Sequence, residues 1–361
     1  TAILTSSLAL SLLRHSSPPN ESFVLSPFSL NTALSIINDG ATGDTQKQLT
    51  ELLLKGCNSS DVTDYYSSLA LSLPSSNASR ISFKSANRFY VDKSISLKVN
   101  YQNHIQDKYK VKVKEIDLTR KGEAAQEMNE FIEESTNGMI KGSIDSEGIS
   151  DNAKGFLINA IYFLGKWRDQ FRKRDTSIRR FKRSKGEIEI DFMQQSDTFS
   201  ANLDNELGTL LILPYQNENF KFFYLMPNEG STLDMLRSEL TGSKLLAMLK
   251  DSRTEYLQII VPKFKIESRL NGLDVLSKMG VNNMRSLDKI SSTPLEVDKI
   301  QHDVVIEMNE SGTEAAGATT VHFGTLSGGW IPDEVRTILI DRPFLFGIIR
   351  NDDILFLGQY A

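Results

Sequence analysis

The chain has 361 residues, of which 40% are hydrophobic and 24% charged, and a formal net charge of −5 at pH 7. This composition is typical of a soluble globular protein, and the mild acidity gives no indication of a nucleic-acid partner. No run approaches the roughly 18 to 20 apolar residues that a membrane span needs. The single cysteine, Cys57, excludes an internal disulfide and a multi-cysteine metal site. We therefore expect a protein without membrane contact, cofactor or metal.

The first third of the chain predicts helices separated by turn clusters. Apolar periodicity places them at residues 8–13, 31–38, 45–54 and 62–73. The pattern becomes strand-like at residues 86–91 and 111–118, with a helix at 100–109 between them. Another helix, at 124–135, is expected to end at Asn137-Gly138, because these residue types readily adopt the left-handed conformation found at helix ends.

Strands dominate the rest of the chain. Residues 156–163 form a nearly continuous apolar run with β-branched and aromatic members, which predicts a strand buried on both faces at the centre of a sheet. Further strands are expected at 210–213, 221–226, 256–266, 304–308, 337–340, 344–349 and 354–357, with helices near 233–240 and 270–279. No repeat or linker divides the sequence, so we expect one mixed α+β domain spanning residues 1–361.

The segment 310–336 lacks an obvious helical or strand pattern and is far longer than the usual loop of about 4–6 residues. Read with a period of two, its first half becomes informative. Every second residue is small or apolar, whereas Glu314 and His322 fall on the other face; the first set is Thr313, Ala315, Gly317, Thr319, Val321, Phe323 and Thr325. Such a loop could become a buried strand, although runs of Ala, Gly and Thr also occur in inert linkers.

At this point the sequence resembles the serpin family, and the likeness covers nearly the whole chain. Matching segments occur in the family's order: Ser26-Pro27-Phe28-Ser29, Gly40-Ala41-Thr42-Gly43-Asp44-Thr45, Asn159 to Trp167, Leu213-Pro214-Tyr215, Val261 to Glu267, Gly312 to Ala318 and Asp341 to Phe346. The resemblance implies a fold of three β-sheets and about nine helices with an exposed reactive-centre loop. It also implies a monomeric suicide inhibitor: a protease cleaves the loop, stays attached as an acyl-enzyme, and is carried along while the loop inserts into the central sheet.

Individual roles follow from the same resemblance. Ser26, Ser29, Asn159 and His302 match the polar shutter cluster beneath the central strands, and Trp167, Lys263 and Glu310 match the breach at the top of the sheet, with Lys263 and Glu310 as a partly exposed ion pair. The hinge of the loop corresponds to Glu310, Gly312, Thr313, Ala315, Ala316, Gly317, Ala318 and Thr319. Phe131 stands where relatives commonly carry tryptophan.

Counting along the family's spacing places the reactive bond between Leu326 and Ser327, which predicts a chymotrypsin-like target. Phe323 and Trp330 are alternative residues after which the protease could cleave, since the segment after Ser327 is longer than in many relatives. Two other functions stay open: a non-inhibitory serpin acting as carrier or chaperone, and a cross-class inhibitor of cysteine proteases. The uncharged hinge favours inhibition.

Enzymatic activity finds little support, because the four histidines form no HExxH pair and no serine lies in a GxSxG motif. A basic segment offers a further site. Arg172, Lys173, Arg174, Arg179, Arg180, Lys182 and Arg183 form either the solvated face of a hairpin or a patch for heparin or another polyanion. Four glycosylation sequons leave the compartment open, and we expect an extracellular rather than a cytoplasmic location.

Overall fold

The computed structural model describes residues 1–73, 81–313 and 334–361, and the side chains of residues 84–86 are not described. Nine α-helices lie in these parts of the chain, six of them between residues 2 and 135 and three between residues 233 and 278. They are α1 (Ala2–Ser16), α2 (Pro27–Gly40), α3 (Gly43–Leu53), α4 (Ser59–Ser72), α5 (Val99–Tyr109), α6 (Lys121–Ser135), α7 (Leu233–Glu239), α8 (Gly242–Lys250) and α9 (Gly272–Lys278). None of the described helices is long and apolar enough to cross a bilayer.

Local sequence signals explain several helix ends. Ser26 caps α2 by accepting a hydrogen bond from the Ser29 N–H, and Pro27 occupies the first turn, where its missing N–H costs nothing. Asn58 and Asp61 form a reciprocal capping box at the start of α4. Helix α6 ends at Ser135 and is followed by Asn137 and Gly138, both with positive φ, as the sequence predicted.

Two hydrogen-bonded sheets form the body of the described structure. The six-stranded sheet has the order β10-β11-β12-β4-β2-β3, and the nine-stranded sheet has the order β1-β15-β14-β8-β7-β6-β9-β13, with β5 paired to β6. The first comprises β2 (Ile81–Asp92), β3 (Val113–Ile116), β4 (Gly155–Lys166), β10 (Phe264–Asn271), β11 (Lys299–Asn309) and β12 (Gly312–Thr313). The second comprises β1 (Phe23–Leu25), β5 (Ser177–Arg183), β6 (Gly186–Asn202), β7 (Gly208–Pro214), β8 (Phe220–Pro227), β9 (Arg253–Pro262), β13 (Arg336–Leu339), β14 (Phe344–Arg350) and β15 (Asp353–Tyr360).

The expected three sheets correspond to this arrangement if the nine-stranded sheet is divided at β6. This strand is 17 residues long, and its two halves pair with different partners: β5 at its beginning and β7 at its end, while β9 pairs along most of its length. Strand β6 therefore connects β5, which pairs with its first half, to β7, which pairs with its end, within one hydrogen-bonded sheet. The α+β class expected from the sequence is confirmed, and β4 contains the apolar run 156–163.

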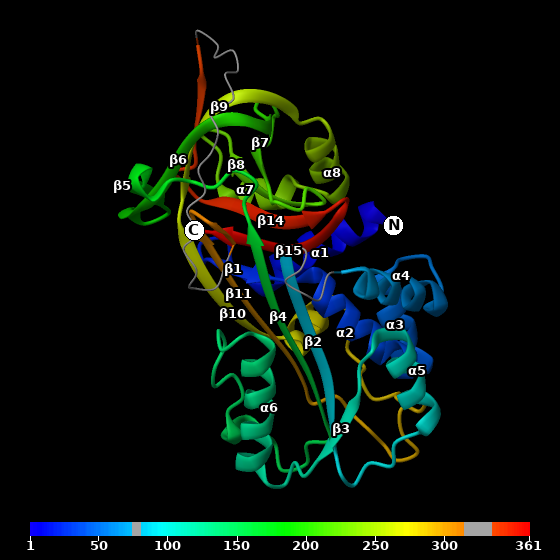
Figure 1. The fold of residues 1–361 in the computed structure, drawn as a ribbon. Helices are drawn as coiled ribbons and strands as arrows, with labels where there is room; N and C mark the ends of the chain where they lie inside the picture. Colours follow the sequence, from blue (N-terminus) through cyan, green and yellow to red (C-terminus); the bar gives the residue numbers. More distant parts are fainter. Residues whose placement is uncertain (74–80, 314–333) are drawn as a thin grey trace.

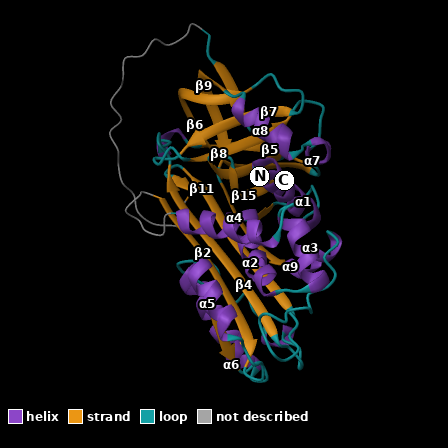
Figure 2. Cartoon of the chain, turned by 90° about the vertical axis from the view of Figure 1, so that its right-hand side faces the viewer, coloured by secondary structure: helices purple, strands orange, loops and turns teal. Residues whose placement is uncertain are grey.

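Three apolar clusters fix the layers. The first packs α1 to α5 and α7 to α9 against the sheets, and the second fills the space between the two sheets with aromatic side chains. The third lies beneath α6, which covers one face of β4 and β2 in the lower half of Figure 1. Figure 2 shows α2, α9 and α3 on the opposite side of the long six-stranded sheet. The sheet is therefore covered on both faces, and any added strand must enter between packed layers.

Candidate functional site

The shutter cluster lies in one row across three neighbouring strands. The register pairs His302 of β11 with Asn159 of β4, and Asn159 with Asn87 of β2. Residues paired in register project to the same face of a sheet, so their side chains meet. The row crosses the junction between β4 and β11, which is the junction that an inserting strand would have to open.

Hydrogen bonds fix the tautomer of His302. Its Nε2 accepts from the Ser26 N–H at 3.0 Å, so its Nδ1 carries the proton and donates to the Asn159 side-chain oxygen. The Asn159 amide in turn donates to Ser29 Oγ at 2.6 Å. Ser26 Oγ donates to the Leu355 carbonyl at 2.6 Å, which connects the cluster to β15. The four side chains expected to form the shutter are thus brought together.

Burial determines the charge of His302. The ring is 1% exposed, and this desolvation lowers its pKa to about 3. The imidazole is neutral at physiological pH, which is what the Ser26 N–H requires of its acceptor. A proton on Nε2 would place two donors against each other, so the cluster is stable only while His302 is uncharged.

The breach forms at the turn between β11 and β12. Lys263 Nζ lies 3.1 Å from Glu310 Oε1, which also accepts from Thr176 Oγ1 at 2.8 Å. The Glu310 side chain is only 7% exposed, so the pair is more buried than the partly exposed pair expected from the sequence. Burial alone would raise the pKa of the Glu310 carboxyl, but hydrogen bonds from its own N–H, Thr176 and Lys263 outweigh it and lower this pKa.

Trp167 holds the same turn from the other side. Its indole Nε1 donates to the Asn309 carbonyl and its backbone N–H to the Ser311 carbonyl, both at 3.0 Å. The ring is 1% exposed and stacks on Tyr215 with centroids 4.6 Å apart. Trp167 is therefore both a core residue and a clamp on the start of the hinge.

The first hinge residues already form a strand in the central sheet. Gly312 and Thr313 constitute β12, which pairs antiparallel with β11 on one side and with β4 on the other. A Cβ on Gly312 would lie 2.0 Å from the Gly165 carbonyl oxygen, so only glycine fits this approach. Thr313 is fully buried, and its hydroxyl lies 2.6 Å from the Tyr215 hydroxyl.

Below this strand the sheet is closed. The parallel pairing of β11 with β4 runs from Lys299 and Phe156 up to Val304 and Ile161, where it stops. Above that point β12 lies between the two strands. The structure thus combines a parted upper end, occupied by the hinge, with a closed lower half secured by the shutter cluster.

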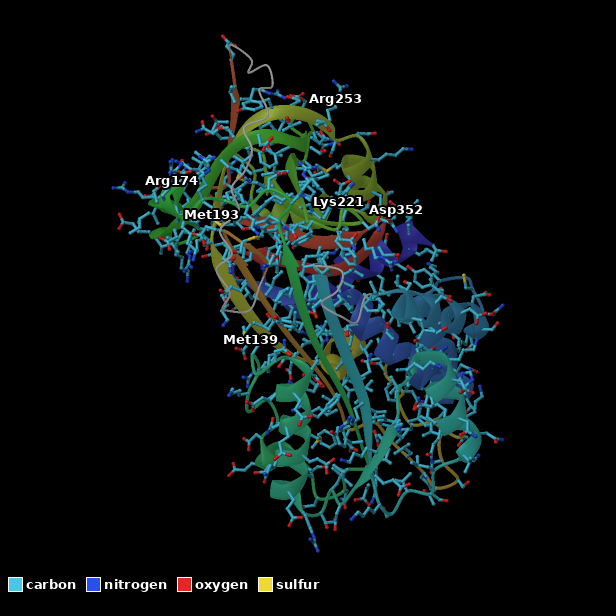
Figure 3. All side chains as sticks on the ribbon, viewed as in Figure 1. Met139, Arg174, Met193, Lys221, Arg253 and Asp352 are labelled. Carbon is cyan, nitrogen blue, oxygen red and sulfur yellow. The ribbon has the colours of Figure 1, made fainter. Side chains whose placement is uncertain are left out.

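The basic residues expected as a patch lie on a hairpin at the edge of the molecule, where Figure 3 labels Arg174. Arg172 precedes the short 3-10 helix η3 (Lys173–Asp175), Lys173 and Arg174 lie in it, and all three are exposed. The other four lie on β5. Side chains alternate along a strand, so Arg179 and Arg183 share the face of buried Phe181, whereas Arg180 and Lys182 lie on the opposite face.

Acidic neighbours neutralise part of this hairpin. Arg180 and Lys182 stand opposite Glu189 and Glu187 in the β5–β6 register, and Lys182 Nζ lies 3.0 Å from Asp341. The predicted patch is therefore divided between two faces, one of which is largely compensated.

The remaining predicted residues of the loop lie outside the described residues: Ala315, Ala316, Gly317, Ala318, Thr319, Leu326 and Ser327. Sequence reasoning missed several partners that complete the site, namely Asn87, Thr176 and Tyr215. Tyr215 belongs to a segment noted for its likeness to the family, which was the available signal. Within the described parts of the chain, no group of His, Cys, Asp or Glu could hold a metal ion.

Comparison with known proteins agrees with this geometry. The family model for Serpin (serine protease inhibitor) matches residues 4–361. Serine protease inhibitor 42Dd of Drosophila melanogaster is 33% identical over 353 residues, which cover 94% of this chain and 91% of that protein. The native thermophilic serpin tengpin has a TM-score of 0.89 at 23% identity, covering 99% of this chain and 93% of tengpin.

A binding protein shares the fold as well. Thyroxine-binding globulin in complex with thyroxine has a TM-score of 0.88 at 23% identity, and the match covers 99% of this chain and 98% of that chain. At 23% sequence identity, the similarity to these two structures shows the fold alone. The family match over nearly the whole length, together with the relative at 33% identity, shows that this chain belongs to the serpin family.

Proposed function

We propose that this serpin is an inhibitor that traps a chymotrypsin-like serine protease as an acyl-enzyme by inserting its cleaved loop between β4 and β11. Members of this family are generally protease inhibitors rather than enzymes, and proteases are their partners. The observation that carries the proposal is β12. The hinge already occupies the first positions of the new strand, so insertion needs extension of an existing pairing and no new nucleation.

The registers of β12 support full insertion. Thr313 pairs with Met308 of β11 and with Gly165 of β4, both antiparallel. Each further loop residue would therefore move one residue down both strands. Continued in this way, Thr319 arrives between His302 and Asn159, at the level of the shutter cluster. Its side chain has the same parity as that of Thr313 and would face the same polar row.

The same count supports the expected reactive bond. The lower end of the β4–β11 junction, at Phe156 and Lys299, is reached by residue 322 of the loop. Cleavage after Leu326 leaves enough chain to fill the whole junction and still carry the attached protease. Cleavage after Phe323 would leave one residue beyond the sheet, and cleavage after Trp330 would leave a longer tether.

The chemistry of trapping uses the protease's own nucleophile. Its serine oxygen attacks the Leu326 carbonyl, the bond to the Ser327 nitrogen breaks, and the released amine takes the proton held by the catalytic histidine. The products are an ester on the protease and a free new N-terminus at Ser327. Insertion then competes with hydrolysis of that ester, so the ratio of the two rates decides whether the protein acts as inhibitor or substrate.

The test is incubation with a panel of serine proteases of apolar, basic and small-residue preference, together with a papain-like cysteine protease. We expect a covalent 1:1 complex on a denaturing gel with the chymotrypsin-like member, and a released C-terminal peptide that begins at Ser327. The matched control is Leu326→Arg, which should transfer complex formation to a trypsin-like protease.

Clean cleavage by every protease without any covalent complex would contradict inhibition and favour the non-inhibitory alternative. A covalent complex with the cysteine protease alone would establish the cross-class alternative. A peptide that begins at Gly324 or Ile331 would move the reactive bond to Phe323 or Trp330 without affecting the mechanism.

A further inference from the structure

A cavity of about 360 Å³ lies apart from the central sheet, between the end of α1, the following segment 17–19, α7 and α9. Its lining is strongly basic: Arg14, His15, Arg237 and Lys278 surround it, and Asp234 is its only acidic member. A volume of this size is within the range of small-molecule sites. The shutter, the breach and the hinge make no use of it.

Two arginines at this cavity each bind the backbone of the other's helix. Arg14 Nη1 donates to the carbonyls of Arg237 and Leu240 at the end of α7, at 2.7 and 3.1 Å. Arg237 Nη2 donates to the Ser17 carbonyl after α1 at 2.8 Å. These bonds use carbonyls that helix ends leave unpaired, so part of the cluster has a structural role.

Donor capacity remains after these bonds are counted. A guanidinium offers five N–H donors and an ammonium three. Arg237 is 5% exposed, and its Nε and Nη1 are buried without an acceptor among the described residues. Lys278 Nζ has a 3.3 Å bond to the His15 carbonyl and is otherwise directed at solvent. Arg237 and Lys278 therefore keep N–H donors for which the described residues supply no acceptor.

The charges at the cavity are also unbalanced. Three permanent cations, Arg14, Arg237 and Lys278, line it with the single carboxylate Asp234, whose charge acts on Arg237. Burial lowers the pKa of both guanidinium groups, and for Arg237 the neighbouring charge of Arg14 acts in the same direction while Asp234 opposes it. A multivalent anion would relieve the repulsion among these cations and could accept hydrogen bonds from the exposed side chains of Arg14 and Lys278.

We propose that this cavity binds a small multivalent oxyanion, such as a phosphate or polycarboxylate group carried by a small molecule. Guanidinium groups suit both, because their planar donors match the oxygens of carboxylate and phosphate. The volume exceeds that of a single orthophosphate and fits a diphosphate or tricarboxylate. Such a ligand would bridge α1, α7 and α9 and hold them together.

The experiment is calorimetric titration of the intact protein, without any protease, with pyrophosphate and with citrate at a constant ionic strength of about 0.15 M. Orthophosphate and chloride serve as comparison anions. We expect saturable 1:1 binding in the submillimolar range for at least one of the two probes, and an increased melting temperature in its presence. Citrate and pyrophosphate distinguish the carboxylate from the phosphate source.

The diagnostic variant is Lys278→Glu, since Lys278 is exposed and its loss leaves the arginine bonds intact. Charge reversal should weaken binding at least about tenfold. The matched control is Lys221→Glu on β8, an exposed lysine labelled in Figure 3 that does not line the cavity, and it should change affinity by less than about twofold. Absence of saturable binding up to about 10 mM, or equal weakening by both variants, would overturn the proposal.

Discussion

Replacement of Thr313 by arginine tests the proposed insertion at its first step. Thr313 is fully buried, and its hydroxyl contacts the Tyr215 hydroxyl at 2.6 Å between β4 and β11. An arginine there would bring a charge among apolar and aromatic side chains, and the Glu310 carboxylate of the adjoining turn is already paired with Lys263. The cost of such an unpaired charge is several kcal/mol, so we expect the hinge to leave the sheet and the start of insertion to be blocked.

The magnitude follows from the competition between insertion and deacylation. If about 4 kcal/mol is added to the barrier for insertion, that step slows about a thousandfold. Hydrolysis of the ester then wins, and the variant becomes a substrate. Native folding should persist, because the lower β4–β11 pairing and the shutter cluster do not involve Thr313.

The assay measures how many inhibitor molecules are consumed for each protease inactivated. This number should rise steeply for Thr313→Arg. It should rise little for Thr313→Val, which keeps the shape and loses only the bond to Tyr215, worth about 1 kcal/mol or about fivefold in rate. Glu314→Arg, on the opposite face of the alternating pattern, should leave inhibition largely intact. Equal values for all three variants would refute insertion along this register.

Three other predictions follow from the site. Glu310→Lys places a second cation beside Lys263 and should raise polymer yield on mild heating, measured by native gel, whereas Glu189→Lys on the exposed hairpin should not. The pKa of His302 is about 3 in the folded protein, whereas that of a free histidine is 6.5. The free energy of unfolding should therefore fall as pH drops below 6.5, by up to about 1.4 kcal/mol per pH unit. Urea unfolding of the wild type and of His302→Asn at several pH values checks this, and an equal slope in both would contradict it. The divided basic hairpin predicts elution from heparin at or below about 0.15 M NaCl, and later elution that Arg172→Gln abolishes would show a true polyanion site.

Much of the fold could be read from local patterns. The apolar run 156–163 lies in β4 between β2 and β11, as its lack of polar alternation predicted. Helix α8 was missed, although Thr241 caps it by accepting from the Lys244 N–H. Strand β6 was also missed, although Ile188, Ile190 and Phe192 alternate with charged residues in its first half and pack against the core.

The site was predictable only in part. The resemblance to the family implied that Ser26, Asn159 and His302 belong together, but the participation of Asn87 depends on the β2–β4 register, which no local pattern specifies. The contact of Thr176 with Glu310 likewise joins residues 134 positions apart. The alternating loop indicated a spare strand, yet nothing in it revealed that Gly312 and Thr313 already lie in the sheet.

The position of β12 determines where the barrier to insertion must lie. Since the upper junction is already parted and occupied, its opening contributes little to the barrier, and the first bonds that a descending strand must break are those of the β4–β11 ladder and the His302–Asn159 bond within it. Both groups are buried, so leaving them unsatisfied would cost about 1–3 kcal/mol each. The residue that reaches this level by register is a threonine, whose hydroxyl can accept from one partner and donate to the other. In the proposed insertion the loop thus carries, at the level of the His302–Asn159 bond, a side chain able to replace that bond, so that neither the imidazole nor the amide would be left unpaired in the core.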